Sequence, residues 1–430
     1  MDIAINALRS TAYAMVKSPY VFILVIFIIM FYRQNKKIVM IQRMIIGDKL
    51  SSSFELTASQ VVYGLLAGLI GSVMLGYLGV TFDENTSVEL IFLISILLMF
   101  INQRFICFSY SAAILGFISV LLEIMRGMYG INVEKLQFLS MDVVALMTLI
   151  AVLHFIEGIL IIADGSKGSI PIFTKKDDKI IGGFALKRYW AIPIALALIV
   201  NSRMYPIDNV IPLSNWDSLL HPTTPLNIIR NAAILLMPFY GVLGYSSVTF
   251  TKTKTQKSIS SGIAVILYSL VLFIFARLAV LNIFFKLFVV VFAPVAHEAM
   301  LYVQRYWEVK KEPKYVSGED GMMVLEVAPN SPASLMGIKS GDLLMEVNHK
   351  KIFKEDDILN TIREASNIAW FKIKRAAGNF EEIRYKSSNN TKKLGIVFVP
   401  MYVPEESMVV KVNENKFSEI LENLKKKDNG

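Results

Sequence analysis

The sequence predicts a polytopic α-helical membrane bundle of eight or nine spans, followed by a small α+β domain. Hydrophobic residues make up 54% of the 430 residues and charged residues only 18%, whereas soluble domains carry about 25% charged residues. Long apolar runs fill residues 1–303, which we interpret as the transmembrane domain. Over residues 312–402 the pattern changes to short stretches bounded by glycine and proline, as in strands and turns. A charged tail, 403–430, ends the chain.

The apolar runs set the number of spans. The first, Pro19–Tyr32, lies near the lower length limit for a membrane helix, so the count is eight or nine. The short run 190–200 is counted because Tyr189 and Trp190 are suited to the membrane interface. The other spans are expected at 60–80, 88–102, 107–125, 141–163 and 231–248, with two more helices within 259–301. Within 60–80, four glycines form a small-residue face that favours close packing: Gly64, Gly68, Gly71 and Gly76.

The positive charge predicts the orientation of the chain and limits its partners. Lysine and arginine residues, which give a net charge of +9, lie mainly between the apolar runs. This is the pattern of the positive-inside rule, and it places the C-terminal domain in the cytoplasm. No nucleic-acid-binding motif accompanies the charge, so we expect lipid and protein partners and no nucleic acid. The N-terminus has no cleavage site after its apolar run and is expected to be an uncleaved anchor.

The stretch Gly321–Lys351 carries the most specific motif. It reads GMMVLEVAPNSPASLMGIKSGDLLMEVNHKK: a strand, a turn, one helical turn, a glycine stop and a second strand. Gly337 and Asn348 stand where left-handed backbone is expected. A helix at 355–365 and three further strands follow, of which 393–399 is the last. This order resembles a PDZ domain, and PDZ domains bind extended peptides by adding a strand to a sheet edge.

The resemblance suggests a peptide groove between the last strand and the helix 355–365. PDZ domains usually present a glycine beside the strand that accepts the ligand, and Leu394-Gly395-Ile396 fits this pattern, although at the end of the domain rather than its start. The alternative is an edge strand with a bend and no groove. The candidate peptide-binding residues are Leu394, Gly395, Ile396 and Val397 on the strand and Ile358, Leu359 and Ile362 on the helix.

No complete catalytic or metal motif appears. His297-Glu298 lacks the second histidine of the H-E-x-x-H metalloprotease motif, and His154-x-x-Glu157 with Asp164-Gly165 lies upstream of it, the reverse of the order in intramembrane proteases. The single cysteine, Cys107, allows no intrachain disulfide and suggests no thiolate metal site. We therefore expect a non-enzyme without metal or cofactor. The alternative is a degenerate intramembrane metalloprotease.

Beyond the C-terminal domain, three stretches resemble the MinJ-type topological determinants of cell division in Gram-positive bacteria. They are PYVFILVIFIIMFYRQNKK, RFICFSYSAAILGFISVLLE and LHFIEGILIIADGSKGSIPIFTKKDDKIIGGFALKRYW. The resemblance implies a membrane adaptor that links DivIVA to the MinC/MinD inhibitor of FtsZ assembly, located in the cell membrane at the septum and poles. A membrane scaffold or regulator of another assembly would share the same features.

Overall fold

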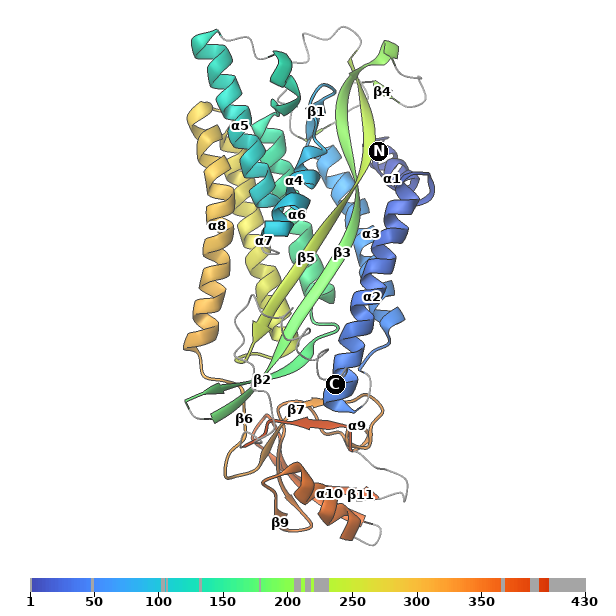
Figure 1. Cartoon of the computed structure of the whole chain (residues 1–430), viewed down its shortest axis with the longest axis vertical. Coiled ribbons are helices and arrows are strands. Elements are labelled where there is room, and N and C mark those ends of the chain that lie inside the picture. Colours follow the sequence, from blue (N-terminus) through green and yellow to red (C-terminus); the bar gives the residue numbers. More distant parts are fainter. Residues whose placement is uncertain are drawn as a thin grey trace.

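The computed structural model describes most of the chain. The described residues are 2–47, 50–101, 105, 107–130, 134–177, 179–204, 210–212, 218–219, 232–364, 368–386 and 394–401. The expected charged tail 403–430 lies outside them. Figure 1 shows an elongated molecule in which the helices run roughly along the long axis and a small C-terminal unit sits at one end.

Eight α-helices are present in the described residues before the C-terminal unit. They are α1 (Asp2–Val16), α2 (Tyr20–Ile46), α3 (Ser53–Tyr77), α4 (Leu90–Ile101), α5 (Phe108–Tyr129), α6 (Val143–Asp164), α7 (Lys254–Leu278) and α8 (Ile283–Lys310), with short 3-10 turns at η2 (Glu134–Leu139) and η3 (Ser202–Met204). Capping boxes at Ser52/Glu55 and Thr253/Gln256 begin α3 and α7, because each pair satisfies two otherwise unpaired backbone N–H groups.

Five helical segments are long and apolar enough to span a membrane. They contain α3, α5, α6, α7 and α8; α1 and α2 are bent by 67° at their junction and pass the same test only as a pair. Large apolar side chains are exposed on the outer faces of these helices, among them Phe22, Leu66, Leu267, Phe284 and Val295. Such surface suits hydrocarbon better than water, so the chain is compatible with a membrane protein.

The predicted bundle of eight or nine spans is wrong. The runs at 190–200 and 231–248 form two long antiparallel strands, β3 (Lys179–Asn201) and β5 (Ala232–Thr249), paired from Phe184↔Thr249 to Asn201↔Ala232. The run at 88–102 yields only the 12-residue helix α4, which is too short to span. Pro193 and Pro238 lie within the two strands and weaken any helix there by about 3 kcal/mol each. The fold is therefore mixed α/β with two sheets.

Short strands complete the first sheet around the β3–β5 hairpin. The order is β1-β3-β5-β4, and β2 and β6 also pair with β3. Only β1 runs parallel to β3; the other pairings are antiparallel. The bounds of these strands are β1 (Thr81–Asp83), β2 (Ile170–Lys176), β4 (Ile211–Pro212) and β6 (Tyr315–Val316).

The glycine face of α3 packs half on a strand and half on helices: Gly64 and Gly68 meet β3, whereas Gly71 meets Ile156 of α6 and Gly76 meets Ile3 of α1. A Cβ at Gly64 would lie 2.3 Å from the carbonyl oxygen of Ala191, and one at Gly68 would lie 2.2 Å from that of Pro193. Only glycine allows α3 to approach the backbone of β3 this closely. One turn further on, Ser72 Oγ accepts a hydrogen bond of 2.9 Å from the N–H of Ala195. The helix thereby satisfies a backbone donor of the strand beside it.

The C-terminal unit is a second sheet with two helices. Its sheet order is β11-β10-β8-β7-β12, and β9 pairs with β8. Gly337 and Asn348 have positive φ, as predicted from the sequence. The bounds are β7 (Met322–Val327), α9 (Pro332–Leu335), β8 (Leu343–Val347), β9 (Lys350–Lys351), α10 (Glu355–Glu364), β10 (Ile368–Lys374), β11 (Phe380–Lys386) and β12 (Ile396–Phe398).

This unit is joined firmly to the rest of the molecule. Strand β6, which directly precedes the unit, pairs with Ile181 and Gly182 of β3. Leu325 and Val399 belong to the same hydrophobic core as the bundle. Lys254 at the start of α7 forms an ion pair of 2.5 Å with Glu326 of β7. Sheet pairing, apolar contact and charge thus all cross the junction.

Candidate functional site

The first candidate site is the edge of β12 in the C-terminal unit. β12 is the last strand of its sheet, and among the described residues no strand pairs with its other side. On its paired side, Gly395 O accepts from the N–H of Ala328 and Val399 N–H donates to Met323 O. Because backbone groups alternate in direction along a strand, those of Ile396 and Phe398 point to the unpaired side. An extended peptide needs such groups to add as a further strand.

The side chains predicted to line the groove lie mostly in the core. Leu394, Ile396 and Ile358 are buried in the unit's own hydrophobic core, and Ile362 is half-buried against it. Val397 points to the opposite face, into the core shared with the bundle. The side chain of Leu359 lies outside the described residues. Both faces of β12 are therefore covered. Ile396 and Phe398 are each only 6% exposed, so a ligand could reach this strand only through its unpaired backbone edge.

Gly395 shapes the approach to this edge. Its φ is +74°, and a Cβ at this position would lie 2.4 Å from Cβ of Ser331. The neighbouring carbonyl of Leu394 accepts from the N–H of Ala333 at the start of α9. Any side chain at position 395 would disturb this turn as well as a ligand, so substitution of Gly395 does not isolate binding from folding.

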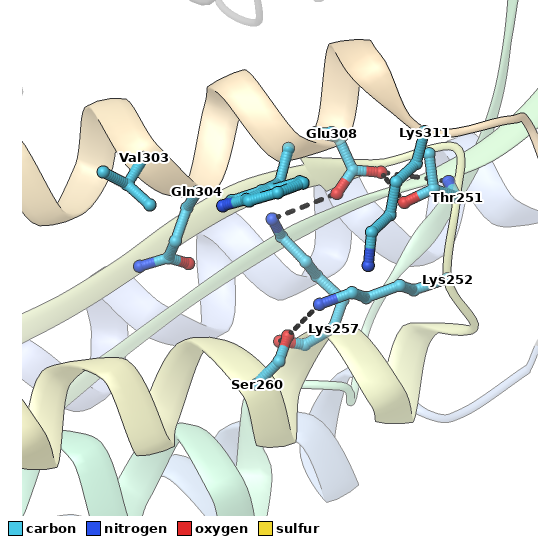
Figure 2. Close-up of a pocket in the computed structure, with 9 residues that line it drawn as sticks. Thr251, Lys252, Lys257, Ser260, Val303, Gln304, Glu308 and Lys311 are labelled. Carbon is cyan, nitrogen blue, oxygen red and sulfur yellow. Dashed lines mark hydrogen bonds and ion pairs between the residues drawn. The ribbon is translucent and has the colours of Figure 1, made fainter.

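A pocket at the end of α7 and α8 nearest the C-terminal unit forms a second candidate. Its volume is about 260 Å³. Figure 2 shows lysines from the segment before α7, from α7 and from the end of α8 converging on it. The lining residues are Thr251, Lys252, Lys257, Ser260, Val303, Gln304, Trp307, Glu308 and Lys311.

The charge of this pocket is positive because three lysines face one carboxylate. Glu308 is already engaged: Oε1 accepts from Phe250 N and Thr251 N, and Oε2 lies 3.3 Å from Nζ of Lys257. Burial and the neighbouring charge of Lys257 lower the pKa of Lys252, which means that its ammonium is short of stabilising anions. The pocket therefore suits an anionic group better than a cation.

A third candidate is a polar cluster inside the bundle, on α5, α6 and α8. The two polar motifs that the sequence analysis treated separately meet here. His154 of α6 and His297 of α8 both face Cys107, which precedes α5, with Sγ–Nε2 distances of 3.1 and 3.6 Å. Glu298 is turned to Tyr110, from which it accepts a hydrogen bond. Sequence spacing gives no sign of this cluster, because its members are joined only by helix packing.

Asp164, the other polar residue noted in the sequence, belongs to a separate cluster at the end of α6. Its Oδ2 accepts from Nε of Arg188 and from Nε1 of Trp190, both at 2.9 Å. Asp164 and Arg188 are completely buried. This ion pair joins β3 to α6, and we interpret its role as structural.

Comparison with protein-family models, with curated proteins and with solved structures finds no match for this chain.

Proposed function

We propose that this chain is a non-enzymatic, multi-pass membrane adaptor that binds an extended segment of a partner protein along the edge of β12. The observation that carries the proposal is the position of β12 at the end of its sheet, with the backbone of Ile396 and Phe398 directed to the unpaired side. Backbone hydrogen bonds supply most of the affinity in strand addition. Because Ile396 and Phe398 are each 6% exposed, this proposal requires the partner segment to lie directly along the unpaired edge.

The same reading is supported by the order of elements in the C-terminal unit. A PDZ-like arrangement places the accepting strand next to a helix, and here Ile396 of β12 and Ile358 of α10 belong to one core. Ile362, one turn beyond Ile358, is half-buried against the same core, and in this proposal it touches a bound side chain. The five apolar helical segments would hold the unit at the cell membrane.

The partners that we propose come from the resemblance to MinJ-type division determinants. In this proposal the C-terminal unit lies in the cytoplasm and the chain links DivIVA to MinD and MinC at the septum and poles. A scaffold for another membrane assembly would have the same architecture. Only the identity of the bound protein separates the two.

The location of the full chain in dividing cells tests the division role. A fluorescent fusion is expected at septa and poles and is expected to spread evenly over the membrane in cells without DivIVA. An even distribution that ignores DivIVA would contradict the division role and leave the adaptor to another assembly.

Binding at the edge of β12 is tested with two matched lysine substitutions on α10. Ile362→Lys places a charge beside the proposed groove and is expected to weaken partner binding about tenfold, which corresponds to about 1.4 kcal/mol. Asn360 is exposed on the same helix, so Asn360→Lys should leave binding unchanged. Because Ile362 also packs against the core of the unit, both variants are first compared with the wild type in thermal unfolding. Co-purification from solubilised membranes then measures partner binding. Equal binding by the two variants would place the partner elsewhere.

A further inference from the structure

The geometry points to a zinc site in the bundle, formed by Cys107, His154 and His297. One ligand atom from each residue, Cys107 Sγ and a ring nitrogen of each histidine, lies within 4.8 Å of the other two. A tetrahedral zinc ion with one thiolate and two imidazole ligands holds sulfur and nitrogen ~3.6 Å apart. The observed separations of 3.1 and 3.6 Å need only a small adjustment to reach this value.

The hydrogen bonds around His154 prepare it as a ligand. Its Nδ1 lies 2.8 Å from the carbonyl oxygen of Ile150 and must donate to it, since a carbonyl only accepts. Nε2 is then the nitrogen that carries the lone pair, and it faces Cys107. A metal-binding histidine is usually oriented by such a bond from its other nitrogen.

The nearby hydroxyl groups do not compete for this lone pair. Tyr268 donates to the carbonyl of Ala293 at 2.8 Å. Its oxygen lies 2.9 Å from Ser109 Oγ, so the proton of this contact must come from Ser109. The Ser109 proton is thereby used, although Oγ lies 3.2 Å from Nε2 of His154. The lone pair on Nε2 of His154 therefore faces Cys107 and is available to a metal ion.

His297 supplies the second imidazole and has one nitrogen without a partner. The residue is 7% exposed, and within the described part of the chain its Nδ1 is buried without a hydrogen-bond partner. A neutral imidazole in an apolar bundle loses free energy when one nitrogen is unpaired. Nε2 faces Cys107 Sγ at 3.6 Å and is the nitrogen that would bind the metal, whereas Nδ1 would carry the proton and would still need an acceptor such as water.

Charge balance also favours a divalent cation at this place. Glu157 lies one turn after His154 on α6, with Oε2 3.8 Å from Nε2 of His154. A thiolate and this carboxylate together carry two negative charges, which balance the two positive charges of Zn²⁺. A neutral assembly is needed because isolated charge is costly in an apolar interior. Glu157 is thus the candidate for the fourth position, and the ion would join α5, α6 and α8.

Metal analysis of the purified full-length chain tests the site. After dialysis against zinc and then buffer, the wild-type chain should retain about one zinc ion per chain, and His297→Ala should retain almost none. His349→Ala, which removes a histidine of the C-terminal unit, should bind as the wild type does. A wild type that holds no more zinc than His297→Ala would overturn the proposal.

Cobalt substitution distinguishes a thiolate ligand from other binding. The Co²⁺ form should show a near-ultraviolet sulfur-to-metal charge-transfer band, and Cys107→His should lose this band while keeping bound metal. The variants His297→Ala and Cys107→His are first checked for a single peak in size-exclusion chromatography, so that a folding defect is not mistaken for loss of metal. Retention of the band in Cys107→His, or its absence from the folded wild type, would contradict the assignment.

Discussion

Two buried polar clusters lie on the same helix, α6, and differ in how their polar groups are used. At the end of α6, Asp164 Oδ2 accepts from Arg188 and Trp190, and Oδ1 lies 3.2 Å from Nζ of Lys167. Nearer the middle, His154 meets Cys107 and His297, and the buried Nδ1 of His297 finds no partner in the described residues. The first cluster has paired opposite charges. The second has soft ligands, a thiol and two imidazoles. Each cluster keeps a buried atom without a hydrogen-bond partner among the described residues, Arg188 Nη1 in the first and His297 Nδ1 in the second.

The difference teaches how to separate structure from binding among intramembrane polar residues. Such residues are costly and usually face a bundle interior, whatever their role. A cluster whose charges are paired within the protein has little to offer a ligand. A cluster in which an imidazole lone pair and a thiol face one another has the ligands that a metal ion needs.

Breaking the paired cluster should have the largest effect on stability. Asp164→Ala leaves the guanidinium of Arg188 buried without its counter-charge, which costs about 3–5 kcal/mol. Thermal unfolding of the purified chain in detergent measures the loss. A variant as stable as the wild type would show that Arg188 can reach another anion or water.

Removing one hydroxyl beside the other cluster should have a smaller effect. Tyr268→Phe takes away the donor to Ala293 O and the acceptor of Ser109, at a cost of about 1–3 kcal/mol. Zinc should still be bound, because Tyr268 is not among the three ligands, although Ser109 is then free to donate to Nε2 of His154 at 3.2 Å and should weaken the affinity. Loss of zinc together with stability would mean that the hydroxyl network, and not the ligand geometry, holds the metal.

The smallest effect is expected at the outer edge of the Asp164 cluster. The side chain of Lys167 is 45% exposed, and exposed ion pairs contribute about 0–1 kcal/mol. Lys167→Ala should therefore unfold nearly as the wild type does, in the same assay as Asp164→Ala. A loss as large as that of Asp164→Ala would show that Lys167 is essential to the charge balance.

Local signals in the sequence predicted some elements and missed others. Asn282, which caps α8, lies in the break between α7 and α8, and this break was expected from the length of 259–301. The left-handed residue at 337 was expected from its glycine. The hairpin was missed, since an apolar run alone does not separate a buried strand from a helix. Prolines do not decide the matter either, because Pro294 lies inside α8 whereas Pro193 lies in β3.

The candidate sites divide in the same way. The edge strand near Gly395 follows from a local motif, so the sequence could indicate it. The burial of Val397 depends on how the C-terminal unit meets the bundle, which no local pattern reveals. Cys107 is 47 positions from His154 and 190 from His297. Their meeting depends on the packing of three helices, and the sequence analysis accordingly expected no metal site.

The pairing of β6 with β3 attaches the C-terminal unit rigidly to the helices, so the unit does not behave as a domain on a flexible linker. A tethered domain searches a volume set by its linker, and its local concentration near a second site falls as the linker lengthens. Here strand pairing at Gly182, together with the ion pair of Lys254 and Glu326, fixes the height and the direction of the β12 edge relative to the helices. A partner that docks on this edge is therefore held at one angle to the bundle, and its reach is set by its own length alone.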